Sequence, residues 1–272
     1  MKKSFTISVS STINSLPIID KARALASRLN LPYHRTIAES TTDFLLLYTD
    51  NGLQLTQASK FAHVKRLLYV DFVRGKNGYR HRKNFTIRQP LAKAIGVKPG
   101  IRPSVFDATA GLGNDAFVLA CLGCRVSLCE RSSILHSLLE DGLFRAGYEE
   151  KTMEIVSARM NLLFEDSKGY LQKNHQVYHS IYLDPMYPHR TNSALNKQEM
   201  RVIRDLVGND EDGDVLLEAA FAAAQNRVVV KRPKGAGELS SRIPSFVVPM
   251  KNSRYDIYLV SERKVKNNIF RW

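Results

Sequence analysis

Residues 105–115 of this 272-residue chain read Val105-Phe106-Asp107-Ala108-Thr109-Ala110-Gly111-Leu112-Gly113-Asn114-Asp115. An apolar run typical of a buried strand ends in an acidic residue, and a Gly-x-Gly turn then opens a helical pattern. The glycines permit a tight turn and a close approach of a ligand to the backbone, while the start of the helix presents unpaired N–H groups. This order predicts a strand–turn–helix unit that binds a ligand at the carboxyl end of its strand.

Short apolar runs alternate with helical patterns on the C-terminal side of this unit. Strand-type runs lie at 125–129, 162–164, 181–183 and 228–230, and helical patterns lie at 115–122, 135–144 and 219–224. Such alternation is typical of a doubly wound, parallel sheet. Two last strands, at 246–248 and 255–260, form a hairpin-like pair that suits an antiparallel edge. We therefore expect an α/β domain over residues 89–272.

The first 88 residues read as a separate, small α/β domain. A strand pattern covers residues 5–9, and a helical pattern begins after Pro17 and covers 18–29. Two further strands, 44–48 and 53–55, flank Asp50-Asn51-Gly52. Because Asn and Gly tolerate positive φ, this tripeptide favours a hairpin turn.

The chain is strongly basic, with 40 Lys and Arg against 26 Asp and Glu and a formal net charge of +14. Between Lys60 and Arg102 there are 12 basic residues and one acid, Asp71. Such a concentrated surplus favours a polyanionic partner, nucleic acid before membrane, and a solvated basic face is the alternative. The predicted RNA contacts in this segment are Arg74, Arg80, Arg82 and Lys83.

Several classes of protein are excluded or disfavoured. Hydrophobic residues make up 44% of the chain, which excludes disorder for most of it. No apolar run approaches the roughly 20 residues that span a bilayer, and the N-terminus lacks the apolar core of a signal peptide. The odd number and close spacing of Cys121, Cys124 and Cys129 disfavour disulfides. Two of them fall at a predicted helix end and one in a predicted strand, which disfavours a zinc site without a fourth ligand from elsewhere. We therefore expect a cytoplasmic protein without a metal centre.

The glycine-rich turn by itself does not identify the class of its ligand, but the acidic residues near it narrow the choice. Gly111-x-Gly113-x-x-Ala116 also fits a dinucleotide fingerprint, and a turn with glycines only for packing is a further alternative. The charge of Asp107, however, would attract a cation and repel a pyrophosphate. The next strand ends in Glu130, where a carboxylate can accept hydrogen bonds from ribose hydroxyls. These features resemble the S-adenosylmethionine site of class I methyltransferases.

A second motif follows the strand run at 181–183 and reads Asp184-Pro185-Met186-Tyr187. It resembles the Asp/Asn-Pro-Pro-Tyr/Phe motif of methyltransferases that modify exocyclic amines of bases. The nitrogen of such an amine shares its lone pair with the ring, so groups that accept its protons make it more nucleophilic. The predicted acceptors are the Asp184 carboxylate and the Pro185 carbonyl, and Tyr187 is predicted to stack on the base, worth about 1–3 kcal/mol. Taken alone, these residues also read as a simple turn.

Further segments, in the same order, resemble the ribosomal RNA small subunit methyltransferase J family. They are 107–113, 115–120, 123–126, 130–131, 183–186 and 228–233, with Val70–Val73 and Tyr255–Tyr258. The resemblance implies a mostly parallel, seven-stranded, Rossmann-like methyltransferase sheet with an antiparallel edge strand. It also implies S-adenosyl-L-methionine as the cofactor and the exocyclic N2 amine of a guanine in 16S ribosomal RNA as the methyl acceptor.

The same resemblance implies which residues contact the cofactor. The contacts of the family fall on Glu130, Arg131, Asp184, Asn114-Asp115, where the family commonly has Arg-Asp, and Asp166-Ser167, where it has two serines. With Asp107, Gly111 and Gly113 of the turn, they form the predicted cofactor site. Lys231-Arg232 closes the strand run at 228–230 at the same edge of the sheet, so we expect both to contact RNA phosphates.

We therefore expect an enzyme whose partner is ribosomal RNA or the small ribosomal subunit. A DNA amino-methyltransferase with the same two motifs is an alternative, which the family resemblance disfavours. An rRNA-binding assembly factor without turnover is another, and it is disfavoured because a degenerate site would have lost some of its acids and glycines. His189 either touches the substrate or is a surface histidine.

Overall fold

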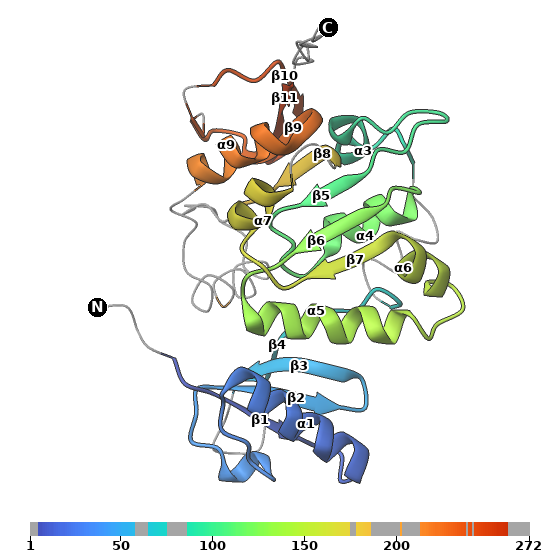
Figure 1. Ribbon diagram of the computed structural model, residues 1–272. Coiled ribbons are helices and arrows are strands. Elements are labelled where there is room, and N and C mark those ends of the chain that lie inside the picture. The colour runs from blue at the N-terminus through green and yellow to red at the C-terminus, as the bar shows by residue number, and fades with distance from the viewer. Residues whose placement is uncertain are drawn as a thin grey trace, which may run out of the picture.

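The computed structural model describes residues 5–57, 65–74, 86–174, 178–185, 202, 213–237, 239–240 and 242–260 (Figure 1). Two sheets organise these residues, one of seven strands and one of four. The larger sheet has the order β10-β11-β9-β8-β5-β6-β7. Its strands are β5 (Val105–Asp107), β6 (Val126–Cys129), β7 (Met160–Leu163), β8 (Tyr178–Leu183), β9 (Ala224–Pro233), β10 (Phe246–Pro249) and β11 (Ser253–Leu259).

The larger sheet confirms the predicted doubly wound, mostly parallel α/β fold. β5 pairs in parallel with both β6 and β8, and β7 and β9 continue the parallel pairing outward. β11 pairs antiparallel with β9 and with β10, so the reversed strand lies one place in from the edge. The chain passes from β5 out to β7 and returns to β8. This places a switch of direction between β5 and β8, where ligands bind in such sheets.

Helices cover both faces of the larger sheet. One face carries α3 (Pro90–Ile95), α4 (Asn114–Cys121), α5 (Ser133–Ala146) and α6 (Met153–Arg159), and the other carries α7 (Ser167–Lys173) and α9 (Gly213–Ala223) (Figure 1). Successive strand residues enter opposite cores, because side chains alternate along a strand. In β9, Val229 packs on the α4 side, whereas Val228 and Val230 pack on the α9 side.

The smaller sheet comprises β1 (Ile7–Ser11), β2 (Phe44–Thr49), β3 (Gly52–Gln57) and β4 (Lys65–Tyr69), in that order, with α1 (Leu16–Leu29) packed against β1. A short 3-10 helix, η1 (Ile37–Glu39), precedes β2. The predicted hairpin is confirmed, since Thr49 pairs with Gly52 across the turn. The first strand lies two residues beyond its predicted start, because its register with β2 begins at Ile7.

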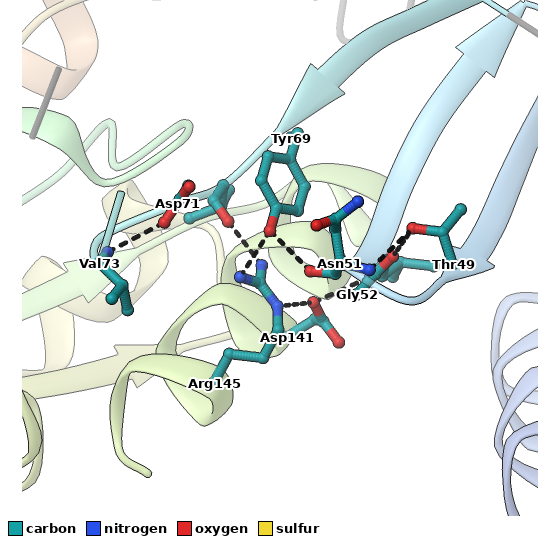
Figure 2. A network of polar contacts seen from close by, with 10 residues as sticks. Thr49, Asn51, Gly52, Tyr69, Asp71, Val73, Asp141 and Arg145 are labelled. Atoms are coloured by element: carbon teal, nitrogen blue, oxygen red, sulfur yellow. Dashed lines mark hydrogen bonds and ion pairs between the residues drawn. The ribbon is translucent and has the colours of Figure 1, made fainter. Parts of the chain in front are cut away.

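The two sheets meet through the C-terminal half of α5 (Figure 2). Arg145 Nε donates to Asp141 Oδ2 at 2.8 Å, and Arg145 Nη1 donates to Tyr69 Oη at 3.0 Å. Asp141 Oδ2 also accepts the Leu53 N–H at 3.0 Å. At Gly52, φ is +109° and an added Cβ would collide with the Arg145 side chain. The hairpin therefore needs glycine both for its turn and for its contact with α5.

None of the helices in the described ranges combines the length and the apolar character that crossing a bilayer requires. The predicted domain boundary at residue 88 stays a prediction. Residues 75–85, which precede it in the sequence, lie outside the described ranges.

Candidate active site

The predicted site residues gather at the carboxyl edge of the parallel strands. Asp107 ends β5, Glu130 follows β6, Asp184 follows β8, and Lys231 lies near the end of β9. Asp115 joins them from the first turn of α4. Parallel strands end at one edge of a sheet, so residues that are far apart in the sequence meet there.

Asp107 is the most deeply buried acid of this group, with 2% of its surface exposed. Its Oδ1 accepts the Thr109 N–H at 3.1 Å. Burial, reinforced by the charges of Asp115, Asp184 and Glu130, raises the pKa of Asp107 to about 8. Asp107 is therefore largely protonated at neutral pH. A bound cation would favour the carboxylate again, which fits the sulfonium and ammonium groups of adenosylmethionine.

The two glycines of the turn serve different purposes. Gly113 has a φ of +71°, and an added Cβ would lie 2.7 Å from Leu139 Cδ1 and 3.1 Å from Phe72 Cζ. Glycine is needed there for packing. Gly111 has a φ of +55°, but the nearest atom to an added Cβ is the Thr109 carbonyl oxygen at 3.9 Å. The space over Gly111 is thus open for a ligand to reach the backbone.

Glu130 connects the turn to the start of α5. Its Oε2 accepts the Gly111 N–H at 2.8 Å, and its Oε1 accepts the Ser132 N–H at 2.7 Å. Only 6% of the residue is exposed. A carboxylate oxygen has two lone pairs, so these bonds are compatible with the predicted contact to ribose hydroxyls. Glu130 therefore shapes the turn in addition to its predicted binding role.

The other predicted cofactor contacts surround this turn. Ser167 is buried at the start of α7, and its Oγ donates to the Ala108 carbonyl at 2.7 Å. Asp166, at the N-cap of the same helix, is exposed, as are Arg131 after β6 and Asn114 at the start of α4. Their roles in binding stay predictions.

A polar network connects the first motif to the second. Lys231 Nζ lies 2.8 Å from Asp184 Oδ2 and 3.1 Å from Asp115 Oδ2. The hydroxyl of Tyr182 donates to Asp115 Oδ2 at 2.6 Å. The Asp184 N–H donates to Thr109 Oγ1 at 2.7 Å. Asp184 is thus held by its backbone and by its carboxylate.

The sequence did not identify Tyr182, Thr109 or the ion pairs of Lys231 as parts of the site. One signal was available, because the hydroxyl of a tyrosine within the buried run 181–183 needs a hydrogen-bond partner. Pro185 is buried after Asp184, whereas Met186, Tyr187 and His189 lie outside the described residues.

The residues predicted to contact RNA differ in their exposure and in whether the structure describes them. Arg74 is exposed, while Arg80, Arg82 and Lys83 lie outside the described residues. Arg232 is 6% exposed, and its Nη2 donates to the Gly237 carbonyl. Such burial argues against the phosphate contact that we expected of Arg232. Lys231 lies among the acids of the site, and its contact with phosphate stays a prediction.

Comparisons with known proteins show the family of the chain. A family model described as "Putative SAM-dependent methyltransferase" matches residues 24–260. The chain is 52% identical over 262 residues to the "Ribosomal RNA small subunit methyltransferase J" of Desulfotalea psychrophila, which covers 96% of this chain and 99% of the relative. It is 48% identical over 243 residues to the protein of the same name from Pseudomonas savastanoi pv. phaseolicola, with 88% and 87% covered.

Among solved structures, the fold is similar to that of a SAM-dependent methyltransferase from Neisseria gonorrhoeae. The TM-score is 0.70 at 29% sequence identity, and the match covers 94% of this chain and 97% of the other. The similarity extends over both sheets, since it covers nearly the whole length of each chain.

Proposed function

The chain belongs to the ribosomal RNA small subunit methyltransferase J family, and from this premise we propose that it methylates the exocyclic N2 amine of a guanine in 16S ribosomal RNA. It is an S-adenosylmethionine-dependent methyltransferase. The observation that carries the proposal is the position of Asp184. Its N–H donates to Thr109 at the turn of the first motif, so the acid of the second motif lies beside the predicted cofactor site.

The residues present fit the cofactor. Adenosylmethionine supplies a methyl group made electrophilic by a sulfonium. The buried Asp107 and the open space over Gly111 suit a cationic ligand close to the backbone, and Glu130 suits ribose hydroxyls. Asn114, Arg131, Asp166 and Ser167 are the further proposed contacts.

Asp184 and Pro185 are proposed to act on the amine. The Asp184 carboxylate accepts one proton of the N2 amine and the Pro185 carbonyl accepts the other, which directs the nitrogen lone pair out of conjugation with the ring. Attack on the methyl group leaves a cationic nitrogen that loses a proton readily. Catalysis therefore rests on orienting the amine and on excluding water. Tyr187 is proposed to stack on the guanine.

Residues 1–88 are proposed to form a domain that presents RNA-binding side chains. The exposed Arg74 follows β4 after a short segment, and Arg80, Arg82 and Lys83 come next in the sequence. Phosphate contacts supply affinity and orientation without reading sequence, so this segment would hold the RNA while the second motif selects the base. A ribosomal RNA substrate places the proposed activity in the cytoplasm.

The test is methyl transfer from labelled adenosylmethionine to small ribosomal subunits, to free 16S RNA and to DNA, each from a strain without this enzyme. Label in RNA that digests to N2-methylguanosine supports the proposal. Label in another nucleoside, or in DNA only, contradicts it. Cofactor binding without transfer to any of the three would identify a non-catalytic RNA-binding factor instead.

A further inference from the structure

Lys231 joins the two motifs of the site through its ammonium group. It reaches Asp184 after β8 and Asp115 on α4 from a third element, β9. The side chains of Lys231, Asp115 and Asp184 are 29%, 23% and 38% exposed, so the group is partly shielded from water. Ion pairs shielded in this way are stronger than those on an open surface.

The charge on Lys231 offsets a concentration of acids. Asp107 lies close to three other acids, and the charges of these acids raise its pKa. They are Asp115, Asp184 and Glu130. Burial alone would lower the pKa of Lys231, but Asp184 and Asp115 more than compensate, so the pKa lies above its ordinary value. The lysine therefore remains cationic over the whole range in which the enzyme can be assayed.

We propose that Lys231 is a positioning residue for methyl transfer, whose ammonium keeps the Asp184 carboxylate ionised and oriented toward the amine. The inference rests on the proposed function, because it assigns Asp184 the role of amine acceptor. Asp115 and Tyr182 complete the arrangement, since Tyr182 donates to the Asp115 oxygen that Lys231 also contacts. When a cation holds one oxygen of a carboxylate, the direction in which the other oxygen points is also defined.

The consequence is a dependence of the rate on pH that Lys231 controls. Without its charge, the neighbouring acids would drive Asp184 to take up a proton at higher pH, and a protonated acid no longer accepts from the amine. An opposite charge at this distance typically shifts a titration by about 1–3 pH units. Removing it should therefore move the acidic limb of the pH–rate profile upward by about one unit or more.

Other titratable groups face this cluster from each packed element. Tyr182 on β8 and Tyr255 on β11 have pKa values raised by burial, so both stay neutral in the assay range. Asp107 on β5, with its pKa of about 8, titrates within that range. Glu130 faces Asp107 from the end of β6. Because these groups are common to all variants, the informative quantity is the difference between profiles.

The experiment compares Lys231→Met, Lys231→Arg and a matched control, Lys234→Met, which removes an exposed lysine three residues along the same edge. Single-turnover methylation of small subunits is measured with saturating adenosylmethionine and RNA from about pH 5 to about pH 9.5. We expect the acidic limb of Lys231→Met to lie about one pH unit or more above that of the wild type, so that the loss of rate is largest at the lowest pH and shrinks as pH rises. Lys231→Arg and Lys234→Met should retain the wild-type limb.

Thermal unfolding and calorimetry with S-adenosylhomocysteine verify that each variant folds and binds. Lys231→Gln replaces Lys231→Met if the apolar side chain impairs folding. An equal loss at every pH would overturn the proposal in favour of a purely structural lysine. An unchanged single-turnover rate with a higher KM for RNA and a smaller salt dependence would overturn it in favour of a phosphate contact. A wild-type chain that binds the cofactor but methylates no RNA would overturn the proposed function, and this inference with it.

Discussion

Replacing Asp107 with asparagine is expected to weaken the dependence of the unfolding free energy on pH. The pKa of Asp107 rises from 3.8 to about 8, chiefly through burial. A group whose pKa is higher in the folded state contributes stability that is complete below its unfolded pKa and is lost as pH rises through its folded pKa. Between about pH 6 and about pH 9 the free energy of unfolding of the wild type therefore falls by about 2–3 kcal/mol. The asparagine variant retains this stability, because its side chain has no proton to release.

Urea unfolding of both proteins near these two pH values measures the effect. The stability of Asp107→Asn minus that of the wild type should grow by about 2–3 kcal/mol from the lower to the higher pH. Asp50→Asn is the matched control, because Asp50 is exposed in the hairpin turn and asparagine suits that turn. Its difference from the wild type should be the same at both pH values.

The same reasoning predicts a proton released when a cation binds beside Asp107. Calorimetry of adenosylmethionine binding near pH 7, in buffers of different ionisation enthalpy, should detect this proton in the wild type and not in Asp107→Asn. A stability difference that stays constant within about 0.5 kcal/mol over the pH range would refute the reasoning. Asp107 would then be ionised in the folded protein, with a partner that offsets its burial.

Three further predictions test the other parts of the site. Asp184→Asn should slow single-turnover methylation by roughly a hundredfold or more, because the charge-assisted acceptor is lost, while cofactor affinity changes only a few-fold; a near-normal rate would make Asp184 a turn residue. Glu130→Ala should weaken cofactor binding more than about tenfold in calorimetry, through lost bonds to ribose and to the Gly111 turn, and unchanged affinity in a folded variant would exclude Glu130 from the site. Neutralising Arg80, Arg82 and Lys83 together should lower RNA affinity and reduce its salt slope by about 0.7–0.9 per lost phosphate contact; an unaltered slope would indicate a merely solvated face.

Features that depend on neighbouring residues in the chain were predictable from the sequence. The strand, glycine turn and helix at 105–121 follow from an apolar run, two glycines and a helical pattern. The hairpin around Asp50-Asn51-Gly52 follows from its turn residues. Short helices were missed, and α7 is an example, because it buries only Ser167 and Leu171 and so shows little apolar periodicity. α9 begins at Gly213, six residues before the start predicted for its helix. Its buried residues Gly213, Leu216 and Leu217 continue the helical spacing of Ala220 toward the N-terminus, and the shorter predicted range left them out.

Residue type and spacing sufficed to predict the two motifs and the acids at the strand ends, and the resemblance of these motifs to those of methyltransferases implied the class of ligand. Tertiary structure alone decided which of two adjacent basic residues enters the site. Lys231 meets Asp184 and Asp115, which are 47 and 116 residues away in sequence, whereas Arg232 is buried and donates to Gly237. Successive side chains of a strand face opposite sides of the sheet. Which side meets the acids depends on where α4 and β8 pack, and no pattern within residues 231–232 contains that information.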